Sequence, residues 1–430
     1  MPKSGNASTY QLARLPQGLA VALRPMEHVE SVAVGLWMRA GGRYETRRAS
    51  GVSHFLEHLL FKGTRTRSCE QLKQAIEGVG GSLNGFTAEE FTCYMAKVPA
   101  RYLRRAVGVL SDMALHPRLA ARDVEKEREV ILEEIRMYED APGQLVHDLF
   151  NELLWPNHPL GHVLSGTLET VRRLTRQDLL AYWRRFYHPQ NCLLACAGAF
   201  EPNRIIRQLR GIFARAPRRP VGRFVAAPRP RTGPQVRVVH KTTEQTHLCL
   251  GTPALARTHR YRFAQELLHV ALGANMSSRL FREVREKRGL VYEIGTHIKR
   301  YQDAGAFVIY AGCAVGKLET TIRTIVTELA RIRRRPMKAA ELRRAKEFYR
   351  GQLLMGLEVT MEHMLWMGEQ AVTVGRIAQP QDLLKEMEAV TARQIQQTAR
   401  LLFETPKLFL AVIGPVPEQQ VAALRELCVL

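Results

Sequence analysis

The order of expected strands and helices occurs twice in this chain, and this repeat constrains the fold more than any other feature. The first half opens with two runs of alternating apolar residues, at 18–26 and 29–41, followed by a helical pattern within 48–72. The second half has a similar pair of runs within 235–254 and a helical pattern within 260–284. Two copies of one unit explain a length of 430 residues, which exceeds the size at which a single core usually stops growing.

A stretch rich in proline and arginine, "ARAPRRPVGRFVAAPRPRTGP", lies between the two copies. It has neither a helical nor a strand period, which indicates a linker at 216–234. We therefore expect an N-terminal domain at 1–215 and a C-terminal domain at 235–430. Both copies mix strands with helices, so the predicted fold class is α+β.

Further strands and helices are expected in the first half, where apolar periods alternate with turn residues. In chain order we expect a helix at 69–81, a strand pair within 82–99, helices at 103–115 and 121–140, and a strand at 191–200. Pro142 and Gly143 are expected to end the long charged helix.

The stretch "GVSHFLEHLLFKGT" places three polar groups among large apolar residues on an expected helix. His54 and His58 are four residues apart, so both imidazoles project from one helix face, with Glu57 on the same side. Neutral imidazoles are good Zn²⁺ ligands, and a neighbouring carboxylate can take a proton from water. This H-x-x-E-H order is the inverzincin pattern. The alternative is that the three groups hydrogen-bond to one another in a core, because burying them unpaired costs several kcal/mol.

A catalytic zinc usually has a third protein ligand from a separate element. The stretch "EKEREVILEEIRMYEDAP" on the long helix offers Glu127, Glu133 and Glu134, interleaved with apolar residues. Helices rich in Glu, Lys and Arg are more often solvated, and the helix pattern alone does not select Glu134 over Glu133.

Composition gives a second line of inference about partners. The chain has 63 Lys+Arg against 41 Asp+Glu, a net charge of +22. A charged run at 330–350 has helical spacing, which favours a solvated helix face over a binding patch. No nucleic-acid motif accompanies the charge, so we do not expect a nucleic-acid partner.

Cysteine usage and the N-terminus indicate the compartment. The seven cysteines are scattered without a C-x-x-C pair, as is typical of reduced thiols in a cytosolic protein. The first residues have no apolar signal-peptide segment, and no run of eighteen apolar residues predicts a membrane span. We therefore expect a cytoplasmic protein.

Several blocks in order resemble one peptidase family. "HFLEH", "FKGT", "EGVGGSLNGFTAEEFTCY" and "EREVILEEIRMYEDAPGQLVHDLF" closely resemble the pitrilysin, insulin-degrading enzyme and mitochondrial-processing-peptidase family, in its single-unit bacterial form. The resemblance implies two homologous α/β-sandwich domains, each a mixed sheet covered by helices, as in metalloenzymes of the mitochondrial-processing-peptidase type. It also implies a zinc-dependent endopeptidase that hydrolyses peptides or unfolded segments inside a chamber.

The same resemblance implies roles for individual residues. The zinc ligands would be His54, His58 and Glu134, and Glu57 would be the general base toward a zinc-activated water. Glu127 would support the metal shell from behind.

The resemblance also implies a substrate-binding surface. The "GGSLNGFTAEEFTCY" block resembles an edge strand that binds an extended peptide, with Asn84 as the expected substrate contact, although a turn role beside Gly85 is an alternative. The family most often has Ala where Gly85 stands. In the second half, Arg285 and Tyr292 of "VREKRGLVYEIG" match an element that orients the substrate carbonyl and stabilises the oxyanion.

Partners follow from the family pattern. For a chain of this length, the resemblance implies a homodimer, with a heteromer containing a related subunit as the alternative. It also implies one zinc ion per chain. A non-catalytic subunit that binds peptides or scaffolds a complex is the main rival function.

Overall fold

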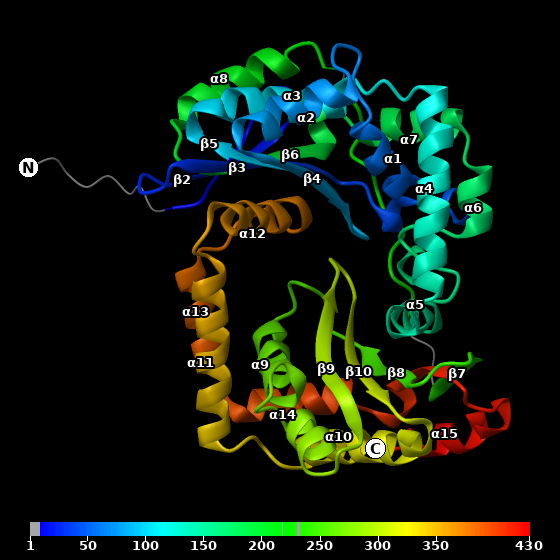
Figure 1. Cartoon of the computed structure of the whole chain (residues 1–430). Coiled ribbons are helices and arrows are strands. Elements are labelled where there is room, and N and C mark those ends of the chain that lie inside the picture. The colour runs from blue at the N-terminus through cyan, green and yellow to red at the C-terminus, as the bar shows by residue number, and fades with distance from the viewer. Residues whose placement is uncertain (1–8, 217, 230–232) are drawn as a thin grey trace, which may run out of the picture. The chain divides into compact units, whose positions relative to one another are not determined.

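A computed structural model describes residues 9–216, 218–229 and 233–430 (Figure 1). The described chain forms two compact units, each built on one sheet. Unit 1 contains 1–135, 163–225 and 354–380, and unit 2 contains 136–162, 226–353 and 381–430. Each unit therefore takes segments from both halves of the sequence.

The sheet of unit 1 has six strands in the order β1-β2-β6-β3-β5-β4. The strands are β1 (Gln11–Arg14), β2 (Ala20–Pro25), β3 (Ser31–Met38), β4 (Ser82–Thr87), β5 (Thr92–Pro99) and β6 (Cys192–Gly198). Only β2 and β6 pair in parallel. The expected strands are present, and β1 is an addition that the sequence did not indicate, because all four of its residues are exposed and lack apolar alternation.

The sheet of unit 2 has five strands in the order β7-β11-β8-β10-β9. The strands are β7 (Gln235–His240), β8 (Thr246–Pro253), β9 (Val291–Arg300), β10 (Gly305–Cys313) and β11 (Phe409–Gly414). Here too only one pair, β7 and β11, is parallel. Without β1, the first sheet has the same order and the same single parallel pair, which confirms two copies of one α+β unit.

Helices cover both faces of each sheet. In unit 1 they are α1 (Val52–Leu60), α2 (Cys69–Ile76), α3 (Leu103–Leu115), α6 (Leu168–Arg173), α7 (Arg176–Phe186), α8 (Pro202–Phe213) and α12 (Thr360–Thr373). In unit 2 they are α5 (Pro142–Leu154), α9 (Arg262–Gly273), α10 (Leu318–Arg334), α14 (Ala392–Leu402) and α15 (Val421–Leu427). Three further helices, α4 (Ala121–Glu139), α11 (Ala339–Gly356) and α13 (Pro380–Glu388), have residues in both unit 1 and unit 2.

Two helices cover the sheet of the opposite half of the sequence. Helix α12 packs on β3 and β6 of unit 1, on the face opposite α3 and α8 (Figure 1), and α5 packs on β8 and β11 of unit 2. A glycine makes room for each helix: a Cβ at Gly35 would lie 2.3 Å from Met364 Sδ, and one at Gly251 would lie 2.7 Å from Phe150 Cζ. The strands of the two sheets lie within 1–215 and 235–430, whereas each compact unit takes segments from both ranges.

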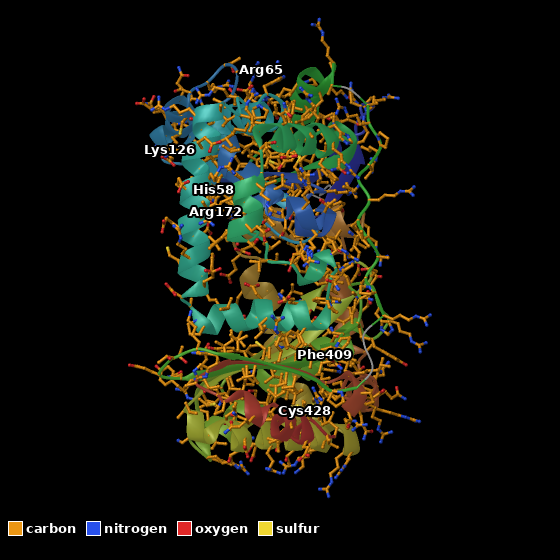
Figure 2. All side chains as sticks on the ribbon, turned by 90° about the vertical axis from the view of Figure 1, so that its right-hand side faces the viewer. His58, Arg65, Lys126, Arg172, Phe409 and Cys428 are labelled. Carbon is orange, nitrogen blue, oxygen red and sulfur yellow. The ribbon has the colours of Figure 1, made fainter. Side chains whose placement is uncertain are left out.

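Each unit has one apolar cluster on each face of its sheet. In unit 2, Phe409 belongs to the cluster under α5, whereas Cys428 belongs to the cluster under α9, α10 and α14 (Figure 2). The described part of 216–234 has no helix or strand. Its first half is nonetheless packed on unit 1, where the Arg43 guanidinium lies 3.8 Å from the centre of the Phe224 ring. No helix in the described part of the chain is long and apolar enough to cross a membrane.

Candidate metal centre

Helix α1 carries the H-x-x-E-H motif and buries one of its faces. Phe55, Leu56, Leu59 and Leu60 are buried in the main apolar cluster of unit 1. The opposite face therefore presents His54, Glu57 and His58, at the i, i+3 and i+4 spacing that the sequence predicts. The core residues fix the helix, and the polar face remains partly accessible.

A buried carboxylate holds the start of α1. Glu45 accepts hydrogen bonds from the backbone N–H of Gly51, at 2.7 Å, and of Ser53, at 2.8 Å. These are two of the N–H groups that no intrahelical partner can satisfy. Burial raises the pKa of Glu45 to about 7, although its hydrogen bonds to Ser53 and Gly51 act in the opposite direction.

Helix α4 brings two glutamates to α1 because they lie seven residues apart on one face. Glu127 is 3% exposed, and Glu134 is about a third exposed beside the two imidazoles. Glu133 lies on the exposed side of the same helix. The structure thus places Glu134, and not Glu133, next to His54 and His58.

The geometry of these three residues fits a shared metal ion. Glu134 Oε2 lies 3.7 Å from Nε2 of His54 and 3.7 Å from Nε2 of His58, and one ligand atom from each residue lies within 4.8 Å of the others. These distances exceed a hydrogen bond, whereas two ligands at roughly 2.1 Å from a tetrahedral zinc lie about 3.4 Å apart. Among the described residues this is the one cluster of His, Cys, Asp or Glu with such spacing.

The imidazoles are prepared for metal binding by their surroundings. His58 Nδ1 lies 3.3 Å from Glu127 Oε2, and the other oxygen of Glu127 lies 2.7 Å from Lys62 Nζ. An N–H at Nδ1 that donates to Glu127 leaves Nε2 with a lone pair for a metal. Burial and the neighbouring His58 lower the pKa of His54 to about 4, which keeps its ring neutral. His58 is labelled on α1 in Figure 2.

Glu57 is held by a residue that the sequence reasoning missed. Thr87 Oγ1, at the end of β4, donates a hydrogen bond of 2.7 Å to Glu57 Oε2. Burial raises the pKa of Glu57, and the Thr87 hydrogen bond partly offsets that rise. Thr87 lies thirty residues beyond Glu57 in the chain, and Lys62 lies in the "FKGT" segment, so no local period marked either residue.

The expected substrate strand is an edge strand of its sheet. Among the described residues, strand β4 pairs with β5 alone and ends the order of the first sheet, so its outer side faces no other strand. Asn84 is exposed on β4, and its side-chain oxygen accepts a 2.8 Å hydrogen bond from the backbone N–H of Gly85. Asn84 is therefore a strand residue and not a turn residue.

Arg285 and Tyr292 lie together in unit 2. Arg285 belongs to a short π-helical turn, Phe281–Glu286, and its guanidinium carbon lies 5.4 Å from the centre of the Tyr292 ring. Tyr292 is the second residue of β9, an edge strand of the second sheet, and is 76% exposed. Their expected action on substrate remains a prediction.

Comparison with protein families and relatives identifies the chain. A family model described as "Insulinase (Peptidase family M16)" matches residues 20–168, and one described as "Peptidase M16 inactive domain" matches residues 173–349. An uncharacterized zinc protease of Streptomyces coelicolor is 37% identical over 428 residues, which cover 97% of this chain and 92% of that relative. The chain belongs to peptidase family M16.

Other M16 relatives and solved structures agree. The uncharacterized zinc protease YmxG of Bacillus subtilis is 35% identical over 93% of this chain and 96% of its own length. A protease from Helicobacter pylori has a similar fold, with a TM-score of 0.89 and 21% identity over 95% of this chain and all of that chain. A peptidase M16 inactive domain from Pseudomonas fluorescens has a TM-score of 0.88 and 19% identity over 95% of this chain and 98% of its own.

M16 membership confirms both the family resemblance and the predicted fold of two homologous domains. The relatives' names also support the expected zinc cofactor. The inactive-domain model matches 173–349, which contains "FAQELLH" in place of the H-x-x-E-H motif. The metal cluster found among the described residues lies in the first half.

Proposed function

We propose that this M16 chain is a zinc-dependent endopeptidase that cleaves peptides or unfolded segments. The convergence of His54, His58 and Glu134 on one point beside Glu57 is the observation that carries the proposal. These three residues would hold one zinc ion per chain, through two nitrogens and one oxygen. Zinc, when bound, makes water easier to deprotonate and polarises a peptide carbonyl.

Glu57 would be the general base. Thr87 fixes one carboxylate oxygen, which leaves the other free to accept a proton from water. A carboxyl whose pKa is raised by burial can then return that proton to the departing amine. Glu127 would orient the His58 ring through Nδ1, and Lys62 would balance the negative charge of Glu127.

Other residues of the proposed mechanism act on the substrate. The free edge of β4 would bind an extended peptide by main-chain hydrogen bonds, with Asn84 as a side-chain contact. Arg285 and Tyr292 would orient the scissile carbonyl and stabilise its developing negative charge. We expect a homodimer, or a heteromer with a related subunit. Light scattering of the chain purified alone would favour the homodimer if it gave twice the mass of one chain, and the heteromer if it gave the mass of one.

Two variants test the proposal through separate readouts. Glu57→Gln should retain one zinc per chain by metal analysis and lose cleavage of a quenched fluorescent peptide by at least about a thousandfold, because the base is gone. His58→Ala should instead lose zinc, because two ligands hold the ion weakly. Cleavage at the parent rate by Glu57→Gln would exclude Glu57 as the base, and zinc retained by His58→Ala would contradict the ligand set.

The rival function is a non-catalytic subunit that binds peptides or scaffolds a complex. It is disfavoured because the described chain has both the metal cluster and an adjacent carboxylate. Peptide binding without turnover by the zinc-loaded protein would favour it.

A further inference from the structure

Unit 1 has a concave surface that shares no residue with the metal centre. It is a groove of about 1350 Å³ on the helical layer, between α3, α8 and the turn at 100–102. Six arginines line it: Arg67, Arg101, Arg104, Arg105, Arg204 and Arg207. No lysine lines it, so every cation in the groove is a planar guanidinium.

Few carboxylates of the chain neutralise this groove. Arg67 pairs with Asp112, and Arg207 lies 3.7 Å from Glu201, the one carboxylate among the residues that line the groove. In the part of the chain that the structure describes, no carboxylate forms an ion pair with Arg104, Arg105 or Arg204. Like charges gathered at this density repel one another, so an anionic partner would be attracted to the groove.

Two helix glycines leave the groove open. Gly108 of α3 and Gly211 of α8 both line it, and a Cβ built on either would meet no atom within 4 Å. Packing within the unit therefore does not require glycine at these positions, although glycine is one of the poorest helix formers. The two glycines let another main chain approach α3 and α8 closely.

We propose that this groove binds an acidic, extended segment of a partner protein. Guanidinium forks match carboxylates in bidentate geometry, and the open space at Gly108 and Gly211 admits a polypeptide main chain. A flat lipid surface would not reach a concave floor. Stacked bases would need a free aromatic ring, whereas the guanidinium carbons of Arg101 and Arg105 lie 5.0 and 4.9 Å from the centre of the Tyr102 ring. The inference does not depend on the peptidase function.

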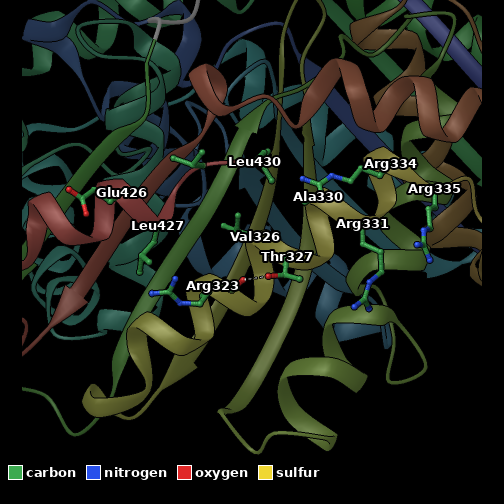
Figure 3. A pocket seen from close by; sticks show the side chains of 11 residues that line it. Arg323, Val326, Thr327, Ala330, Arg331, Arg334, Arg335, Glu426, Leu427 and Leu430 are labelled. Atoms are coloured by element: carbon green, nitrogen blue, oxygen red, sulfur yellow. Dashed lines mark hydrogen bonds between the residues drawn. The ribbon is translucent and has the colours of Figure 1, made fainter.

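Fluorescence anisotropy of a short labelled peptide of alternating Glu and Gly tests the proposal. The full chain is used with Glu57→Gln, so that the probe is not cleaved. The groove variant carries Arg104→Glu, Arg105→Glu and Arg204→Glu. Its matched control carries Arg323→Glu, Arg334→Glu and Arg335→Glu in an arginine-lined pocket of unit 2 (Figure 3), which changes the net charge equally.

We expect salt-sensitive binding that the groove variant weakens by at least about tenfold and the control variant by less than about twofold. A second variant, Gly108→Leu with Gly211→Leu, fills the open space beside these two helix positions. It should keep or raise the melting temperature, because leucine is a better helix former, and still weaken the peptide by about tenfold.

Three outcomes would overturn the proposal. The first is absence of peptide binding, and the second is equal weakening by the control variant, which would indicate charge without a site. The third is tighter binding of single-stranded DNA or phosphatidylserine vesicles than of the peptide, with loss in the groove variant, which would assign the groove to another polyanion.

Discussion

Thr87 is the residue that gives Glu57 a fixed orientation, since its hydroxyl donates to one carboxylate oxygen. We predict that Thr87→Val lowers kcat by about tenfold, the effect of losing one hydrogen bond worth roughly 1–2 kcal/mol. Bound zinc should remain at one per chain, because Thr87 does not contact the ligands. Thr87→Ser keeps the hydroxyl and should stay near the parent rate. Equal rates for the valine and serine variants would show that the hydrogen bond does not matter.

At the residue scale, the sequence predicted those parts of the site whose positions follow from the geometry of a single helix. His54, Glu57 and His58 share a helix face because of the helical period, and the structure places them so. The helix pattern alone could not choose between Glu133 and Glu134; only the family resemblance did. Thr87 and Lys62 were missed because their partners come from other elements, and no period in one segment records a contact with another.

At the scale of elements, the start of α1 depends on the buried Glu45. Its pKa is about 7 when folded, against an ordinary value of 4.5, because burial disfavours the charged form. Below about pH 4.5 the carboxyl is protonated in both states. As the pH rises through about 7 the folded state holds the proton longer, so stability is lost over this window, by about 3 kcal/mol at most.

Glu45→Gln cannot ionise, so we predict a smaller fall in melting temperature between pH 5 and about pH 8 than in the parent. The comparison of the two slopes cancels all other titrating groups, which the variant leaves unchanged. Calorimetry of both proteins across this range measures the effect. Parallel slopes would mean that Glu45 does not titrate in this window.

Gly85 of β4 lies where a side chain has little room. A Cβ at Gly85 would lie 3.1 Å from Phe61 Cζ and 3.2 Å from the backbone oxygen of Cys93. We predict that Gly85→Ala costs about 1 kcal/mol, because the Phe61 ring must move by a few tenths of an ångström. In a Phe61→Leu background the same substitution should cost less, as a double-mutant cycle of denaturant unfolding would measure. An unchanged cost would show that Phe61 is not the obstacle.

The expected helices and strands were found because apolar periods mark buried faces. Strand β1 was not, since it buries nothing. Helix α5 begins at Pro142, the residue expected to end the preceding helix, and both roles suit a proline. An amphipathic period shows that a helix has a buried face, but it does not show which sheet that face covers.

At the scale of the whole molecule, each half of the sequence supplies a helix that covers the sheet of the other half: α5 covers the second sheet and α12 covers the first. Because of this exchange, neither half of the sequence has a complete core. We predict that residues 1–215 alone form a species that binds a hydrophobic dye and self-associates. Without α12, the sheet face formed by Ala33, Trp37 and Leu193 is exposed. Adding a peptide of residues 354–380 should reduce dye binding. A monomeric fragment with a cooperative melting transition and no dye binding would contradict this prediction.

The same exchange delays completion of the first unit during translation. The last strand of its sheet ends at Gly198 and α12 ends at Thr373, so 373 − 198 = 175 residues must be added before the helix is available. At roughly 5–20 residues per second the ribosome needs about 9–35 s for this stretch. Loop closure and chain collapse are far faster than this stretch of translation. The nascent first sheet therefore has one apolar face exposed to solvent until α12 is synthesised. For that interval the chain should be a client of ribosome-associated chaperones.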